Sequence, residues 1–157
     1  MKKIASFEVD HNRLLKGVYV SRIDHFKDTT LTTFDLRMKM PNAEALENGA
    51  IHTLEHLLAT FFRNDATFGK KVVYFGPMGC LTGMYLILES ALTSRDILPL
   101  LIDGFKFVST YEGDIPGVSA IECGNYKLHD LEGAKSEAMG YLQILENATD
   151  ANLNYPV

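Results

Sequence analysis

Residues 51–63 constrain the fold of this chain more than any other segment. On a helix that turns about 100° per residue, their apolar side chains form one broad face, which predicts a helix that covers a hydrophobic core. His52 and His56 lie four positions apart on a neighbouring stripe and are therefore adjacent in space. Two such imidazoles can bind one metal ion, and Glu55 borders the same stripe. The pattern favours a metal site with a carboxylate beside it over two unrelated surface histidines.

The composition indicates one globular domain over residues 1–157. A chain with 46% hydrophobic and 22% charged residues is long enough for one proper core and too short for two comfortable ones. Its net charge of −5 is spread without a basic cluster, which argues against nucleic acid or a membrane surface as the partner and favours a small molecule or another protein. The amino terminus has no apolar secretion segment and nothing spans a membrane, so we expect a cytoplasmic protein whose two cysteines stay reduced.

Two pairs of strands and three helices are expected. Alternating polarity among β-branched and aromatic residues predicts two hairpins. Their strands are residues 18–26 with 30–40 and residues 71–75 with 81–89. Apolar spacing predicts helices from Asn48-Gly49 to about residue 64, over 94–111, and from the N-cap Asp130 to about residue 147. The final ten residues are expected to be loosely held. We predict an α+β fold, a two-layer sandwich of an antiparallel sheet with helices packed on one face.

The two cysteines are candidates for a third metal ligand, because one helix supplies only two. Cys123 lies in a short Cys-Gly-Asn segment expected beside a strand, where Gly124 lets the backbone pass close to a metal. Cys80 ends the turn Pro77-Met78-Gly79-Cys80, which can present its thiol to a pocket. From the residues alone, either cysteine can be the ligand and the other an acid or base, and each can equally be a small buried hydrophobe.

Six segments, taken together and in order, point to a family. They are Ser6-Phe7 with Asp10-His11, Phe34-Asp35-Leu36-Arg37, Pro41-Asn42, His52-Thr53-Leu54-Glu55-His56-Leu57, Pro77-Met78-Gly79-Cys80 with Thr82-Gly83, and Glu122-Cys123-Gly124-Asn125-Tyr126-Lys127. Over nearly its whole length the chain resembles the S-ribosylhomocysteine lyase family, also called LuxS or autoinducer-2 synthase.

The resemblance implies a homodimeric, metal-dependent enzyme. In such an enzyme His52, His56 and Cys123 hold one divalent metal per subunit, Fe(II) natively and often Zn or Co in preparations. Cys80 and Glu55 form the general acid/base pair.

Four further positions match family residues near the substrate. Ser6, His11 and Arg37 would line the substrate pocket, with residues near the amino terminus reaching the site of the other subunit. Arg63 would lie near the homocysteine carboxylate. Without the resemblance, these four would be read as ordinary surface, strand or helix-end residues.

The implied reaction converts S-ribosylhomocysteine to homocysteine and 4,5-dihydroxy-2,3-pentanedione, the autoinducer-2 precursor. The carbonyl moves along the ribose and homocysteine then leaves by β-elimination, so each step removes a proton beside a carbonyl. A metal with an open position acts as a Lewis acid on that carbonyl. Cys80 as thiolate would serve the early proton shifts, and Glu55 the later transfer and the elimination.

The chain departs from the family pattern at two places. Tyr74-Phe75-Gly76 stands where many members have Asp-x-Ser, whose Asp helps to hold the substrate amino group, so we expect altered affinity for the amino acid end. Gly17-Val18-Tyr19-Val20 replaces Ala-Pro-Tyr-Val, a change expected to affect the start of a strand.

Two alternative functions remain at this stage. His-x-x-Glu-His is also the inverzincin signature, which suggests a zinc peptidase-like protein, although Cys123 and the short chain argue against it. The other is a non-catalytic relative that binds a metal or ligand. Intact Cys80 and Glu55 argue against that reading.

Overall fold

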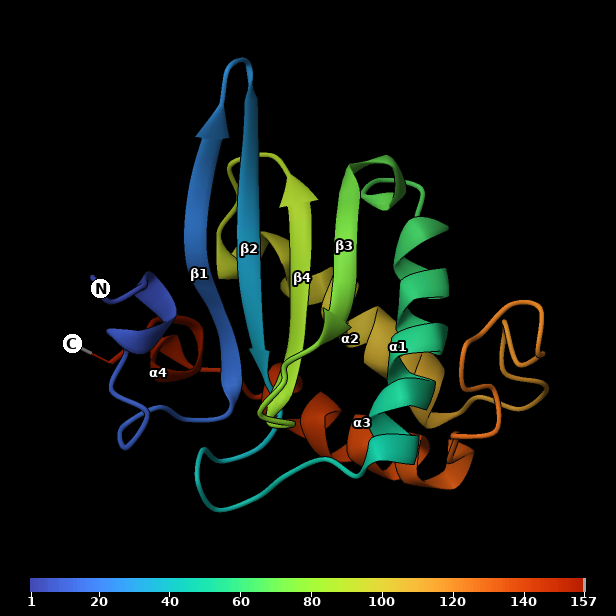
Figure 1. Cartoon of the computed structure of the whole chain (residues 1–157). Helices are drawn as coiled ribbons and strands as arrows, with labels where there is room; N and C mark the ends of the chain where they lie inside the picture. Colours follow the sequence, from blue (N-terminus) through green and yellow to red (C-terminus); the bar gives the residue numbers. More distant parts are fainter. Residues whose placement is uncertain (157) are drawn as a thin grey trace.

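The computed structural model describes residues 1–156 and has a four-stranded sheet with helices packed on one face (Figure 1). The strands are β1 (Gly17–Phe26), β2 (Thr29–Arg37), β3 (Val72–Pro77) and β4 (Gly83–Glu89). Their order is β1-β2-β4-β3, and every neighbouring pair is antiparallel. The predicted α+β fold is confirmed.

Alternation along β2 decides which residues reach each face of the sheet. Phe34 and Leu36 are fully buried in the core beneath the helices, opposite Leu86 and Met84 of β4. Because successive side chains in a strand point to opposite faces, Asp35 and Arg37 lie on the face away from the helices. This strand therefore delivers an ion pair to the open side of the sheet.

Helix α1 (Asn48–Arg63) is the predicted amphipathic helix. Its apolar face is buried against the sheet and the neighbouring helices, while His52, Glu55 and His56 are only partly covered. The buried residues are Ala50, Ile51, Thr53, Leu54, Leu57, Leu58 and Phe62.

Helices α2 (Ser94–Ser109) and α3 (Leu131–Glu146) pack against each other and against α1. A capping box at Thr93 and Asp96 begins α2. The Asp130 carboxylate accepts a hydrogen bond from Gly133 N and begins α3, as predicted. Residues 110–130 form a long loop between the two helices that passes beside α1 (Figure 1).

Several element boundaries differ from the sequence prediction. β2 ends at Arg37 because the next two backbone N–H groups both bond Thr82 O. Gly76 and Pro77 belong to β3 and not to the turn, which leaves residues 78–82 as the connecting loop. Residues 118–121 contain a bend and a turn and no strand, so Cys123 lies in a loop without the strand expected beside it.

The expectation of a loosely held carboxyl terminus is wrong. Residues 150–153 form the short helix α4 (Asp150–Leu153), and Leu153 is buried in the core. The ring of Tyr155 stacks on Tyr19 of β1, with centroids 4.8 Å apart. Tertiary contacts hold this tail in place, and a local pattern does not reveal them.

Two 3₁₀ turns complete the structure, η1 (Ala5–Phe7) near the amino terminus and η2 (Gly69–Lys71) before β3. Among the described residues, no helix is both long and apolar enough to cross a membrane.

Candidate active site

Four donor residues meet at the amino-terminal half of α1. One ligand atom from each of His52, His56, Cys123 and His129 lies within 4.8 Å of the others. The Cys123 Sγ to His52 Nε2 distance is 3.5 Å. A sulfur and a nitrogen bound to one tetrahedral ion also lie about 3.5 Å apart, given bond lengths of about 2.3 and 2.0 Å. The predicted ligand set therefore fits a metal ion in both chemistry and spacing.

Backbone carbonyls fix the two helix imidazoles. His52 Nδ1 lies 2.5 Å from Leu128 O, and His56 Nδ1 lies 2.7 Å from Pro116 O. A carbonyl only accepts, so both Nδ1 atoms carry the proton and both Nε2 atoms present a free lone pair. Such partners are typical of metal-binding histidines, since they fix the tautomer and the ring orientation.

His129 is the donor that sequence reasoning missed. Thr53 Oγ1 donates to Gly49 O and accepts from Asp130 N, so its contact with His129 Nδ1 at 3.0 Å is accepted from the imidazole. Nε2 of His129 therefore has a free lone pair, and it is buried without a hydrogen-bond partner. Burial, and then the neighbouring imidazoles, lower the pKa of His129 to about 4, which keeps it neutral.

Ring geometry separates His129 from the other donors. Its ring stacks on His52 at 21° with centroids 3.9 Å apart, whereas His52 and His56 are perpendicular. Two imidazoles on one ion must each aim an in-plane lone pair at it, which face-to-face rings cannot do. Ring geometry therefore favours His52, His56 and Cys123 as the residues that could share one ion, with the His129 ring stacked on His52.

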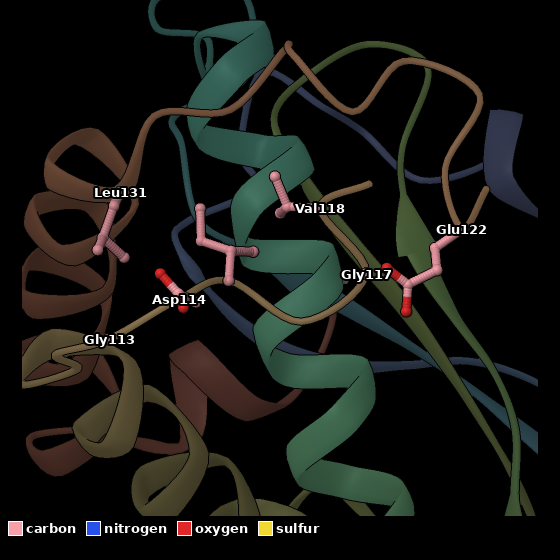
Figure 2. A pocket seen from close by; sticks show the side chains of 7 residues that line it. Gly113, Asp114, Gly117, Val118, Glu122 and Leu131 are labelled. Carbon is pink, nitrogen blue, oxygen red and sulfur yellow. The ribbon is translucent and has the colours of Figure 1, made fainter. Parts of the chain in front are cut away.

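The long loop 110–130 supplies Cys123 and both backbone acceptors. Gly117 has a φ of +73°, and an added Cβ there would lie 3.2 Å from His56 Nδ1. Beside this loop, a cavity of about 440 Å³ is lined by Asp114, Val118 and Glu122 of the loop and by Leu131 of α3 (Figure 2). The donor cluster does not line this cavity, and we assign it no role in the chemistry.

A separate site surrounds Cys80. The thiol lies 3.0 Å from Thr82 Oγ1, and Arg37 Nη1 donates to the same hydroxyl at 2.6 Å. Arg37 can only donate, so the Thr82 proton is left for the sulfur. Burial opposes ionisation of the Cys80 thiol, but the hydrogen bonds from Thr82 and the charge of Arg37 outweigh it and lower the Cys80 pKa.

The predicted substrate residues Ser6, His11 and Arg37 gather beside Cys80. All four line one cavity of about 260 Å³ on the face of the sheet that the helices leave open. The side chain of His11 bonds its own segment through Val9 O, and Arg37 is nearly fully buried.

Glu55 lines a different cavity of about 390 Å³ together with His52. Pro77 at the end of β3 contributes to it together with Met78, Gly79 and Leu81 of the loop 78–82, whereas Cys80 of that loop lines the cavity described above. The two predicted acid/base residues thus lie in separate cavities of this chain, with that loop contributing to both.

Arg63 is not brought to either cavity. Its guanidinium donates to the carbonyls of Val72 and Val73, which fixes the end of α1 to β3. Tyr74 lies on the open face and lines a third cavity with Ser6 and Tyr85. Its hydroxyl lies above Gly76, and a Cβ added at position 76 would lie only 2.0 Å from it, so a side chain there would displace the Tyr74 ring.

Comparison with known proteins identifies the family. The S-Ribosylhomocysteinase (LuxS) family model matches residues 4–151. S-ribosylhomocysteine lyase of Phocaeicola vulgatus is 54% identical, covering 99% of this chain and 98% of the relative. The lyase of Clostridium beijerinckii is 56% identical, covering 99% of each. That of Borreliella afzelii is 50% identical, covering 99% of this chain and all of the relative. On this match across almost its entire length, the chain belongs to the S-ribosylhomocysteinase (LuxS) family.

Proposed function

We propose that this chain is a metal-dependent lyase that cleaves S-ribosylhomocysteine to homocysteine and 4,5-dihydroxy-2,3-pentanedione. The observation that carries the proposal is the His52, His56 and Cys123 cluster, whose spacing fits one metal ion. Relatives of about 50% identity over the whole chain are named S-ribosylhomocysteine lyase, which supports the same substrate here. An inverzincin-type peptidase is not favoured, because the family match covers nearly the entire chain.

His52, His56 and Cys123 would hold one divalent metal per subunit, and His129 would support His52. Three protein ligands leave a position for substrate, and a bound metal there would supply Lewis-acid polarisation of the sugar carbonyl. We propose Fe(II) as the native metal, with Zn or Co as substitutes, since imidazole and thiolate ligands accept all three.

Cys80 and Glu55 would move the protons. The lowered pKa of Cys80 favours a thiolate that can take the proton beside the carbonyl in the early shifts. We assign Glu55, beside His52 in the second cavity, the later transfer and the elimination that releases homocysteine.

Ser6, His11 and Arg37 would bind substrate beside Cys80, as their shared cavity supports. Arg63 as a contact for the homocysteine carboxylate stays a prediction, and its bonds to β3 would have to open for that role. Tyr74 would change affinity for the amino acid end. We also propose a single catalytic domain over residues 1–157 and a cytoplasmic location.

We propose a homodimer with its active sites at the interface. Phe7 and Tyr74 are exposed beside the cavities of the open sheet face, being 70% and 46% accessible. Large exposed aromatic side chains next to a substrate cavity are typical of a surface that another protein covers.

The test is metal-dependent release of homocysteine thiol. Metal-loaded protein should produce thiol in large excess over enzyme, and chelator-treated protein should produce none. Glu55→Gln and Cys80→Ala should keep the metal and lose at least about 100-fold in rate, because each removes a proton-transfer group. His52→Ala should lose both metal and activity.

His25→Ala is the matched histidine control, because His25 lies on β1 and contacts Thr30 outside the cluster. It should keep both metal and activity. Metal-loaded wild-type protein that releases no thiol would contradict the lyase proposal. Loss of metal from Glu55→Gln or Cys80→Ala would contradict the ligand set.

A further inference from the structure

The carboxyl-terminal tail closes over the side of the sheet that carries Asp35. Asn152 Nδ2 donates to Lys16 O, and Leu153 is buried in the core. These contacts place α4 beside β1 and the amino-terminal segment (Figure 1). Tyr155 then stacks on Tyr19 with the two rings 13° from parallel. The tail therefore has a fixed course that ends next to the strand bearing Asp35.

The Tyr155 hydroxyl donates to Asp35 Oδ2 at 2.8 Å. Asp35 also binds Arg37 in a two-point contact, with Oδ2 to Nη2 at 2.6 Å and Oδ1 to Nε at 3.1 Å. Asp35 and Arg37 are only 2% and 3% exposed. Burial, and then the Asp35 charge, raise the Tyr155 pKa far above its ordinary value, so its hydroxyl stays a donor.

Arg37 connects the Tyr155–Asp35 contact to the Cys80 thiol. Its remaining Nη1 group donates to Thr82 Oγ1 at 2.6 Å and lies 4.0 Å from Cys80 Sγ. Hydrogen bonds that involve charged groups are about twice as strong as neutral ones, and chains of them strengthen one another in a buried setting. A continuous path of side chains thus runs from Tyr155 through Asp35, Arg37 and Thr82 to the sulfur.

We infer that Tyr155 is a positioning residue: its hydroxyl fixes the Asp35–Arg37 pair, and through that pair it sets how readily Cys80 Sγ ionises. Its catalytic meaning rests on the proposed function, but the reactivity of the thiol does not. Without the hydroxyl, the Asp35 carboxylate keeps only its two bonds from Arg37, so the position of the pair, and of Arg37 Nη1 beside Thr82 and Cys80, is less tightly fixed.

The test measures alkylation of Cys80 by iodoacetamide against pH in metal-loaded Tyr155→Phe and wild-type protein, with Cys80 and Cys123 peptides resolved by mass spectrometry. Phenylalanine keeps the stack on Tyr19 and removes only the hydroxyl. The acid limb of the profile should move to higher pH, with alkylation about three- to tenfold slower at a fixed pH on that limb, since one pKa unit is tenfold. The other charged or titratable groups near Cys80, His11, Arg37 and Tyr85, are unchanged in this variant.

Tyr111→Phe is the matched control, because its hydroxyl donates to Asp114 O in the loop 110–130 and not to Asp35. It should leave the Cys80 profile unchanged. A second variant that ends at Asn154 should shift the profile in the same direction as Tyr155→Phe. Wild-type profiles in both tail variants would overturn the inference. Absent thiol release from S-ribosylhomocysteine would instead count against the lyase proposal and leave this result standing.

Discussion

The Thr82 hydroxyl lies 3.0 Å from the Cys80 sulfur, so Thr82→Val tests how the thiolate is stabilised. Valine keeps the shape and removes the hydroxyl that donates to the sulfur. The Cys80 pKa should rise, because the charged form loses its hydrogen bond, and alkylation at neutral pH should slow by about three- to tenfold. Thr82→Ser should retain the wild-type profile. A valine variant that alkylates like wild type would mean that Arg37 alone sustains the thiolate.

The site histidines differ in how far the sequence alone reveals them. His52 and His56 were predictable as neighbours because four residues separate them on one helix. Nothing local marks His129, whose place beside His52 depends on the bonds of Asp130 N to Gly49 O and Thr53 Oγ1, between the starts of α3 and α1. The only local signal is that His129 directly precedes Asp130, the N-cap of α3. That signal does not tell how close His129 lies to His52 of α1.

Among the larger elements, the loop 110–130 carries Cys123 and bonds His56 through Pro116 O, although it contains no helix or strand. Gly117→Ala should weaken metal binding. An added Cβ would lie 3.2 Å from His56 Nδ1 and would push the imidazole away from its hydrogen bond to Pro116 O. The left-handed backbone adds about 1–2 kcal/mol of destabilisation. Metal content after dialysis and a denaturant melt measure the two effects separately.

Gly113→Ala provides the comparison for that loop. Its φ of +125° makes alanine strained as well, but the new Cβ would approach only Tyr111 Oη, at 3.9 Å. It should therefore lose stability and keep the metal. Equal metal loss in both variants would mean that loop strain, and not the His56 contact, governs binding.

Elements were predictable where the signal was local. Strand alternation and the Asp130 cap gave the hairpins and the last helix. Strand ends were not predictable. β2 ends where Met38 N and Lys39 N both donate to Thr82 O, a contact between residues far apart in the sequence. The tail was misjudged for a related reason: Tyr155 is fixed by Tyr19 and Asp35, more than 100 residues away in sequence.

In the whole molecule, the predicted catalytic and substrate residues are divided between one cavity on the open sheet face and another beside α1. The Cys80 cavity includes Ser6 and His11 from the amino-terminal segment, whereas Glu55 and His52 line the cavity beside α1. If the proposed homodimer is formed, symmetry makes every contact between subunits occur twice. Sedimentation of the metal-loaded protein should give twice the 17.5 kDa mass of one chain.

Mixed dimers test whether the amino-terminal residues of one subunit serve the metal of the other. His11→Ala and His52→Ala, each inactive alone, are co-expressed with different tags. In a mixed dimer with shared sites, one site carries both changes and the other carries neither, so random assembly should restore roughly a quarter of wild-type thiol release. Sites built within single chains would leave every site with one change and the mixture inactive. A monomer in sedimentation would contradict the dimer itself, while an inactive mixed dimer would place His11 and the metal in the same chain's site.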